Sequence, residues 1–192
     1  MSDDLRTMIF EVRGPSAPDE AGGNAPAAAG WIGLVASARG LRLLALPAPT
    51  HEEALVRVRG HYADVRMVAE DAFLSGVARQ VEEFLTGRRR QFNVDLDLRG
   101  NTSFGLAVWA AAARIPYGET RTYAWIAAQV GSVPGAAQAV GTALGANPVP
   151  LIIPCHRVIG SDGSLHGFAG GLDMKGRLLA METGQAHMTL DI

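Results

Sequence analysis

The chain contains one cysteine, Cys155, in the sequence PLIIPCHRVI, directly before His156 and Arg157. A thiolate is a strong nucleophile, and it forms near neutral pH when a base or a positive charge lies close by. His156 is the candidate base and Arg157 the candidate charge. A catalytic base also needs an acceptor that orients it, and Glu182, in a helix predicted from Lys175 to Thr183, is the candidate. These residues predict chemistry at a cysteine nucleophile, although a lone Cys-His pair is more often structural.

The residues before the cysteine indicate a buried strand. The run from Val149 to Ile153 is apolar and ends at Pro154, so we expect the thiol at the end of a strand. Because neighbouring residues of an extended chain point to opposite sides, a direct, well-aligned hydrogen bond from Cys155 to His156 is not expected. A bridging water or a turn at Pro154 is needed to connect them.

The composition is that of a folded globular protein. The 192 residues are 48% hydrophobic and include 17 basic and 19 acidic side chains, so a broad polyanion-binding surface is not expected and a polyanion must be gripped locally. No apolar run reaches the roughly 20 residues of a membrane span, and the acidic start is unlike a signal peptide, which favours a cytoplasmic protein. A single cysteine excludes an intrachain disulfide and a multi-thiolate zinc site.

Residues 1–95 are expected to form an N-terminal α/β domain with a small antiparallel sheet plus helices. The predicted strands are Met8 to Gly14, Trp31 to Ser37 and Leu41 to Leu46, the last two forming a hairpin. Residues 15–30, rich in Pro, Gly and Ala, are expected to form a surface loop.

Two helices are expected in the same domain. The first spans His51 to Val58. The second begins at the N-cap Asp71 and ends at Gly87. Its expected buried face consists of Phe73, Val77, Val81 and Phe84.

Residues 96–192 are expected to form a second, mostly helical domain. Its first helix is capped by Thr102 or Ser103, and its expected buried face consists of Phe104, Val108 and Trp109. The next helices are predicted at Tyr123 to Val130, capped by Thr120 or Thr122, and at Gly135 to Ala146, with a turn at Ser132 to Pro134 between them. Two short helices joined in this way fit a helix-turn-helix.

The second helix of this pair, GAAQAVGTALGA, has almost no side chains long enough to read bases in a major groove. Small residues allow close approach of the backbone, so contact with DNA is expected in the minor groove. Tight packing inside the protein is an equally good interpretation of the same pattern.

The sequence NPVPLIIPCHRV, residues 147–158, resembles the active-site signature of the O6-alkylguanine-DNA alkyltransferases, which repair DNA directly. The resemblance extends through RGNTSF (99–104), VW (108–109), IPYGET (115–120), Tyr123, AVG (139–141), GGL (170–172), Lys175 and LLA (178–180). It covers residues 84–184 closely and the N-terminal part more loosely. It implies a ribonuclease-H-like N-terminal domain and a winged helix-turn-helix C-terminal domain.

The resemblance also implies roles for the candidate residues. Cys155 would take an alkyl group from O6 of guanine irreversibly, as a methylated-DNA–protein-cysteine methyltransferase does, with no metal or organic cofactor. His156 would remove the thiol proton through a water, and Glu182 would hold His156. Tyr123 would help to rotate the nucleotide out of the duplex and would donate to N3 of guanine, while Asn147 would join the recognition helix to the active-site segment.

Double-stranded DNA carrying the lesion is the implied partner of a monomeric protein. The implied DNA contacts are Tyr123, Ala136, Ala137, Gln138, Ala139, Gly141, Thr142 and Arg157. The extruded base requires a pocket. Its implied walls are Phe168, Ala169, Gly170, Gly171 and Lys175.

Two residues depart from the family pattern. Gln138 stands where the family usually has an arginine that enters the base stack, which predicts weaker base flipping or lower DNA affinity. Ala169 stands where some members have a serine. A lesion-binding sensor with weak transfer is therefore an alternative function, although Cys155 argues against it. A DNA-binding regulator and a cysteine hydrolase are more distant alternatives.

Overall fold

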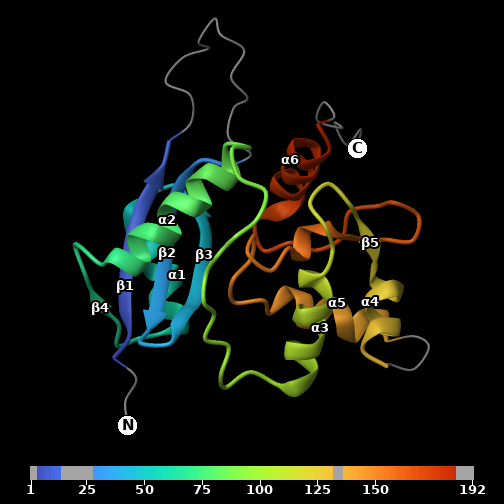
Figure 1. Cartoon of the computed structure of the whole chain (residues 1–192), viewed down its shortest axis with the longest axis horizontal. Coiled ribbons are helices and arrows are strands. Elements are labelled where there is room, and N and C mark those ends of the chain that lie inside the picture. The colour runs from blue at the N-terminus through green and yellow to red at the C-terminus, as the bar shows by residue number, and fades with distance from the viewer. Residues whose placement is uncertain (1–3, 14–27, 132–135, 185–192) are drawn as a thin grey trace, which may run out of the picture. The chain divides into compact units, whose positions relative to one another are not determined.

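The computed structural model describes residues 4–13, 28–131 and 136–184. The chain divides into two compact units, residues 1–99 and 100–192, each built from its own elements (Figure 1). Most of the predicted loop at residues 15–30 and the predicted turn at residues 132–134 lie outside the described residues. Among the helices in the described ranges, none combines the length and the apolarity that crossing a membrane requires.

The first unit contains a four-stranded mixed sheet with the order β3-β2-β1-β4. Its strands are β1 (Arg6–Val12), β2 (Gly30–Ser37), β3 (Gly40–Ala48) and β4 (Arg66–Met67). The predicted hairpin and the antiparallel pairing of the first three strands are confirmed. The prediction of a purely antiparallel sheet is wrong, because β4 pairs parallel with β1. A strand of two residues is too short to leave a periodic signal in the sequence.

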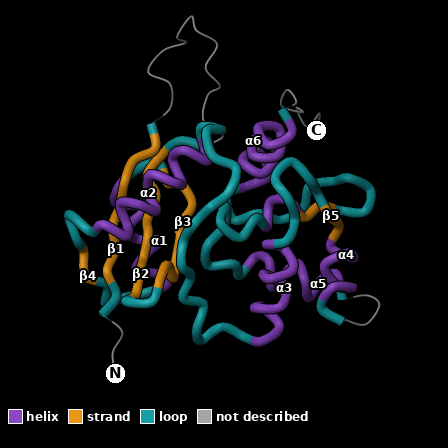
Figure 2. The backbone as a smooth tube through the Cα atoms, viewed as in Figure 1, coloured by secondary structure: helices purple, strands orange, loops and turns teal. Residues whose placement is uncertain are grey.

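Helices α1 (His51–His61) and α2 (Ala72–Leu85) cover opposite faces of this sheet, as Figures 1 and 2 show. The Asp71 side chain accepts a hydrogen bond from the Leu74 amide, so the predicted N-cap is confirmed. The predicted end of α2 is confirmed by Gly87, whose φ is 72°. Three of the four residues expected on the buried face, Val77, Val81 and Phe84, are buried. Phe73 is only half-buried, and its neighbour Leu74 is buried instead. That face consists of Leu74, Val77, Ala78, Val81, Phe84 and Leu85.

The segment after α2 returns to β3 and anchors a buried carboxylate. The Leu41 amide donates to the Asp95 carbonyl, and the Asp97 amide donates to the Leu41 carbonyl. Asp97 is 4% exposed and accepts hydrogen bonds from Arg99, Ser37 and Arg42. The Arg99 guanidinium, ahead of the other donors, holds the pKa of Asp97 well below its usual range.

The second unit is mostly helical. Its elements are α3 (Ser103–Ala113), β5 (Arg121–Thr122), α4 (Tyr123–Gln129), α5 (Ala137–Gly145), the 3-10 helix η1 (Cys155–Arg157), β6 (Val158–Ile159) and α6 (Gly171–Thr183). Thr102 caps α3 and Thr122 caps α4, each accepting from a backbone amide in the first turn. The indole of Trp109 donates to the Ala143 carbonyl at 2.8 Å and joins α3 to α5. Phe104 was expected on the buried face of α3 but is 37% exposed.

Candidate active site

The backbone before the cysteine turns sharply. The prediction of a strand at residues 149–153 is wrong: Pro150 and Ile153 form an isolated bridge, and the Ile153 amide donates to the Val149 carbonyl. Leu151, between them, has a φ of 73°, which L side chains rarely adopt. A short apolar run does not distinguish a strand from a buried turn. The expected burial is nevertheless present, since Leu151 is 1% exposed.

Asn147 holds this turn against the cysteine. Its Oδ1 accepts from the Val149 amide, and its Nδ2 donates to the Ile153 carbonyl at 2.9 Å. The same Nδ2 lies 3.4 Å from Sγ of Cys155, within hydrogen-bonding distance of a sulfur. One side-chain amide therefore fixes both the backbone before the thiol and the thiol itself.

Cys155 begins the 3-10 helix η1, so it is not in extended backbone as the sequence argument assumed. The turn at Pro154, one of the two connections considered, is present because the Arg157 amide donates to the Pro154 carbonyl. Cys155 is half-buried, whereas His156 is completely buried. The two neighbours thus differ in their access to solvent.

Glu182, in the last turn of α6, is bound by both residues that follow the cysteine. Its Oε1 lies 2.8 Å from Nε2 of His156. The Arg157 guanidinium donates to both carboxylate oxygens, at 2.8 and 2.9 Å. The Gly118 amide adds a further donor at 3.1 Å. This network brings together η1, α6 and the turn after α3.

The position of Arg157 corrects an expectation. It was expected among the DNA contacts, but it is 7% exposed and its guanidinium binds Glu182 and the Ile115 carbonyl. A guanidinium held in this way cannot also reach a phosphate at the surface. The structure therefore gives Arg157 the role of a buried partner of Glu182.

The charges in this network follow from the hydrogen bonds. Burial raises the pKa of Glu182, but the hydrogen bonds from His156 and Arg157 outweigh it and lower the pKa to about 2. Burial lowers the pKa of His156, against the effect of Glu182. An ionised Glu182 can only accept, so the neutral imidazole carries its proton on Nε2. Its other nitrogen, Nδ1, is then the basic atom.

The thiol and Lys175 form a second electrostatic pair. Burial raises the pKa of Cys155, while the Asn147 hydrogen bond and the charge of Lys175 act in the opposite direction. Lys175 is fully buried, and its ammonium donates to the carbonyls of Val158 and His166, both at 2.7 Å. Burial lowers the pKa of Lys175 to about 8. A thiol that is protonated at rest requires a base before it can react.

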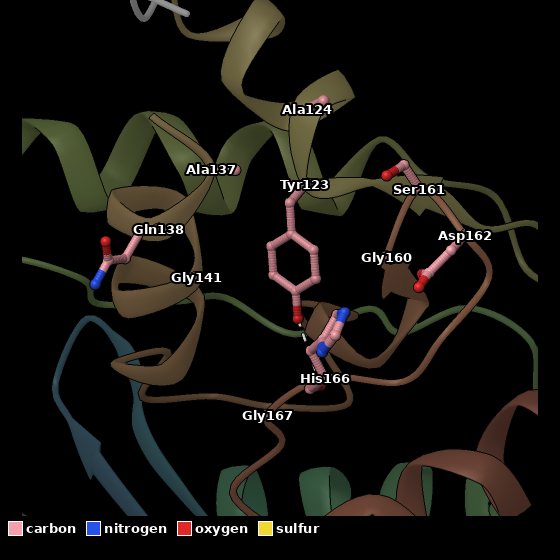
Figure 3. A pocket seen from close by; sticks show the side chains of 10 residues that line it. All are labelled: Tyr123, Ala124, Ala137, Gln138, Gly141, Gly160, Ser161, Asp162, His166 and Gly167. Carbon is pink, nitrogen blue, oxygen red and sulfur yellow. Dashed lines mark hydrogen bonds between the residues drawn. The ribbon is translucent and has the colours of Figure 1, made fainter. Parts of the chain in front are cut away.

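A pocket of about 570 Å³ opens beside Tyr123 in the second unit (Figure 3). Its lining residues are Tyr123, Ala124, Ala137, Gln138, Gly141, Gly160, Ser161, Asp162, His166 and Gly167. The Tyr123 hydroxyl donates to the His166 carbonyl at 3.4 Å. Burial raises the pKa of Tyr123, with Cys155 adding to the shift, so its phenol remains a donor at neutral pH.

The implied walls of the pocket for the extruded base stay a prediction, because Cys155 is not among the described residues that line this pocket. Among the described lining residues, none of the five expected walls at positions 168–171 and 175 occurs. Phe168 lies instead beside His156, with the ring centroids 6.3 Å apart. The loop from Gly160 to Gly167 supplies half of the lining, and the sequence analysis missed it. Its letters GSDGS indicate a turn, but they carry no signal for a pocket.

Within residues 4–13, 28–131 and 136–184, no group of three or more His, Cys, Asp or Glu side chains is placed to hold a metal ion. The groups that the structure brings together at this site are the Cys155 thiol and the buried imidazole and carboxylate of His156 and Glu182.

Comparison with known proteins gives the class of protein that carries this site. Residues 103–184 match the model of the 6-O-methylguanine DNA methyltransferase DNA-binding domain. The methylated-DNA–protein-cysteine methyltransferase of Mycobacterium tuberculosis H37Rv is 49% identical over 118 residues, 62% of this chain and 70% of that protein. The inducible enzyme of Bacillus subtilis is 42% identical over 141 residues, 73% and 77% of the two chains. The chain belongs to the O6-methylguanine DNA methyltransferase family.

Solved structures agree with this assignment. The crystal structure of Mycobacterium tuberculosis O6-methylguanine methyltransferase is 38% identical, with a TM-score of 0.67 and coverage of 95% of this chain and 98% of that one. The structure of Mycobacterium tuberculosis OGT in complex with DNA is 35% identical, with a TM-score of 0.67 and coverage of 96% and 95%. The mixed sheet and the helices of this chain are those of these enzymes.

Proposed function

We propose that this protein repairs DNA directly, by moving the alkyl group of O6-alkylguanine to Cys155 in a single turnover. The observation that carries the proposal is the buried hydrogen bond between His156 and Glu182 beside the only thiol of the chain. In the reaction the sulfur attacks the alkyl carbon, the bond from that carbon to O6 breaks, and its electron pair stays on guanine. The product is a stable thioether, so the protein acts once.

The thiol proton leaves through His156. Because Glu182 engages Nε2, the proton from Cys155 goes to Nδ1, through a bridging water. The imidazolium that forms is stabilised by the ionised Glu182. Asn147 and Lys175 stabilise the thiolate while it exists.

The guanine that leaves needs a proton or a hydrogen bond. Tyr123 lines the pocket with its ring, and its phenol remains protonated at neutral pH. We assign it the hydrogen bond to N3 of the departing base. Its present bond to the His166 carbonyl is long, at 3.4 Å, which is consistent with exchange for a substrate atom.

Helices α4 and α5 are proposed as the helix-turn-helix of a winged domain, with α5 in the minor groove. The outer face of α5 supports this: Ala137, Ala139 and Thr142 are exposed and small, and Gln138 is the one longer side chain beside them. Small side chains allow the close approach that a narrow groove demands. The complex of the Mycobacterium tuberculosis relative with DNA supports the same partner.

The first unit is proposed to have a ribonuclease-H-like arrangement. The order β3-β2-β1-β4, with three antiparallel strands and β4 parallel to β1, supports this assignment. Helices on both faces of the sheet support it further.

The test is the mass of the protein after exposure to duplex DNA containing O6-methylguanine. We expect the native chain to gain one methyl group, located on Cys155 by peptide fragmentation. A Cys155→Ser variant should gain none and should leave the lesion in the DNA. An unmodified native chain, or repair by the Cys155→Ser variant, would contradict the proposal.

Gln138 favours a second function, recognition of the lesion with slow transfer. Glutamine is shorter than arginine and uncharged, so the base stack is filled less well when the lesion leaves it. Tight binding of lesion DNA with methylation of Cys155 that takes hours would support this sensor. Complete methylation within the time of binding would exclude it.

A further inference from the structure

Three polar side chains converge over Gly160 in the pocket wall. Ser164 Oγ lies 2.5 Å from Asp162 Oδ1 and 2.8 Å from His166 Nε2. A Cβ added to Gly160 would lie 2.5 to 2.8 Å from the polar atoms of all three. The absence of a side chain at Gly160 therefore makes room for this array.

The hydrogen bonds fix the orientation of each proton in the array. The pKa of Asp162 is lowered, chiefly by the Ser164 hydroxyl, so its carboxylate is an acceptor only. The single Ser164 hydroxyl proton is used in that bond, and Ser164 Oγ must therefore accept from Nε2 of His166. The second nitrogen of His166 becomes a donor only when the ring takes up a proton.

The array lies beside Tyr123 in the wall of the pocket. Figure 3 shows the His166 ring beside the Tyr123 hydroxyl, with Asp162 farther along the same loop, and the ring centroids of His166 and Tyr123 are 6.1 Å apart. Gln138, on the opposite side of Tyr123, directs its amide away from the Tyr123 ring (Figure 3). Among the described residues that line the pocket, His166 is the one that can carry a positive charge.

We propose that His166, held by Ser164 and Asp162, binds a phosphate of the DNA backbone at the mouth of this pocket. The inference rests on the proposed function, because it assumes that DNA meets this face. Phosphates receive half or more of the hydrogen bonds in protein–DNA interfaces, and an imidazolium offers them a charged donor. Gln138 is uncharged, and a chain with a net charge of −2 offers DNA no broad positive surface. The His166 contact supplies a positive charge at one place instead.

Other charged groups around His166 shape this contact. The Asp162 carboxylate places a negative charge on the far side of Ser164 from His166. Lys175 contacts the His166 carbonyl with its ammonium, and Tyr123 presents a neutral phenol. Phosphate binding by the imidazolium is therefore coupled to proton uptake, and it weakens as the pH rises.

The test compares binding of unmodified duplex DNA by the native chain, His166→Gln, and the control His61→Gln, an exposed histidine of the first unit. Each affinity is measured over a salt series at about pH 6 and about pH 8. At the lower pH we expect His166→Gln to weaken binding several-fold and to reduce the slope of log K against log salt by about one. At the higher pH the affinities of the native chain and of His166→Gln should converge. His61→Gln should bind with the affinity of the native chain at both pH values.

A second variant separates the array from the histidine itself. Gly160→Ala changes no polar group, but its methyl would displace the array, so it should weaken binding at the lower pH as His166→Gln does. Equal affinities and salt slopes for the native chain and His166→Gln at both pH values would overturn the inference. A loss of affinity in His166→Gln that is the same at both pH values would also overturn it. Methylation of Cys155, followed in the same samples, reports separately on the proposed function. If the native chain is methylated at Cys155 and His166→Gln binds DNA as the native chain does, only this inference is refuted.

Discussion

Nε2 of His156 lies 2.8 Å from Oε1 of Glu182, and the side chains of both residues are completely buried. Because both side chains are shielded from bulk solvent, the carboxylate accepts the hydrogen bond from Nε2 without competition from bulk water, and it holds the ring proton on that nitrogen. The same carboxylate also neutralises Arg157, so one side chain of α6 holds two residues of η1.

Replacing Glu182 with Gln should reduce the free energy of unfolding by about 3 kcal/mol at neutral pH, since it leaves a buried guanidinium without its counter-charge. Urea denaturation measures this loss. The matched control is Glu119→Gln, which breaks an exposed pair with Arg121 and should cost under about 1 kcal/mol. Equal losses in the free energy of unfolding for the two variants would show that the buried pair stabilises the fold no more than the exposed pair does.

The pH dependence of this loss follows from the pKa of Glu182, which is about 2 in the folded chain and 4.5 when unperturbed. A lowered pKa contributes stability that is complete above the unfolded value and disappears as the pH falls through the folded one. The gap between native chain and Glu182→Gln should therefore be constant above about pH 5 and should narrow toward pH 2. A gap that widens in acid would contradict the assignment.

Asn147→Asp should make the thiol less acidic and slow its alkylation. An aspartate can still accept from the Val149 amide, but it cannot donate to the Ile153 carbonyl or to Cys155, and it places a negative charge beside the sulfur. The rate of reaction with iodoacetamide, followed against pH, reports on the thiolate. The pH midpoint should rise relative to the native chain, whereas Asn101→Asp, at an exposed position, should leave it in place.

Lys175→Met should raise the same midpoint by a different route. Burial raises the pKa of Cys155 and the Lys175 charge lowers it, so removing that charge should let the pKa of the thiol rise. Arg177→Met, on the exposed side of the same helix, serves as the control. If the iodoacetamide profile of Lys175→Met coincides with that of the native chain, the pairing of Lys175 with the thiol has no effect on reactivity.

Gln138→Arg should accelerate repair of duplex substrate more than repair of single-stranded substrate. The arginine can fill the stack that the lesion leaves and can neutralise phosphate, whereas a single strand has no stack to fill. Single-turnover transfer rates on the two substrates give the ratio directly. An unchanged rate on duplex DNA would mean that Gln138 does not limit flipping.

Gly40→Ala should destabilise the first unit by about 2 kcal/mol or more. Gly40 has a φ of 149°, and an added Cβ would overlap the Asp95 carbonyl. The control is Gly76→Ala, an equal change inside α2 with nothing within 4 Å, which should stabilise by up to about 1 kcal/mol. Thermal or urea unfolding of both variants tests the contrast.

Local chemistry explains what the sequence predicted well. Asp71, Thr102 and Thr122 cap helices because a short side chain can reach the first free amides, and that signal is complete within four residues. The pairing of His156 with Glu182 followed from the requirement that a catalytic base be oriented. Both inferences depend on the properties of the residues themselves.

Properties of the assembled fold explain what was missed. The resemblance implied that Arg157 contacts DNA, and its actual partners, Glu182 and the Ile115 carbonyl, are far away in the sequence. The turn at Leu151 was taken for a strand because its residues are apolar. The pocket wall at residues 160–167 consists of ordinary turn letters, and only the folded chain places them beside Tyr123.

The bond that orients His156 comes from the final turn of α6, which ends at Thr183. A protease that trimmed the chain just ahead of Glu182 would spare the cysteine, the imidazole and the pocket lining, yet it would remove the acceptor that both His156 and Arg157 use. The last turn of α6 must therefore be intact for Cys155, nearly thirty positions earlier, to react. A truncated fragment would retain the signature motif without the carboxylate that orients its base.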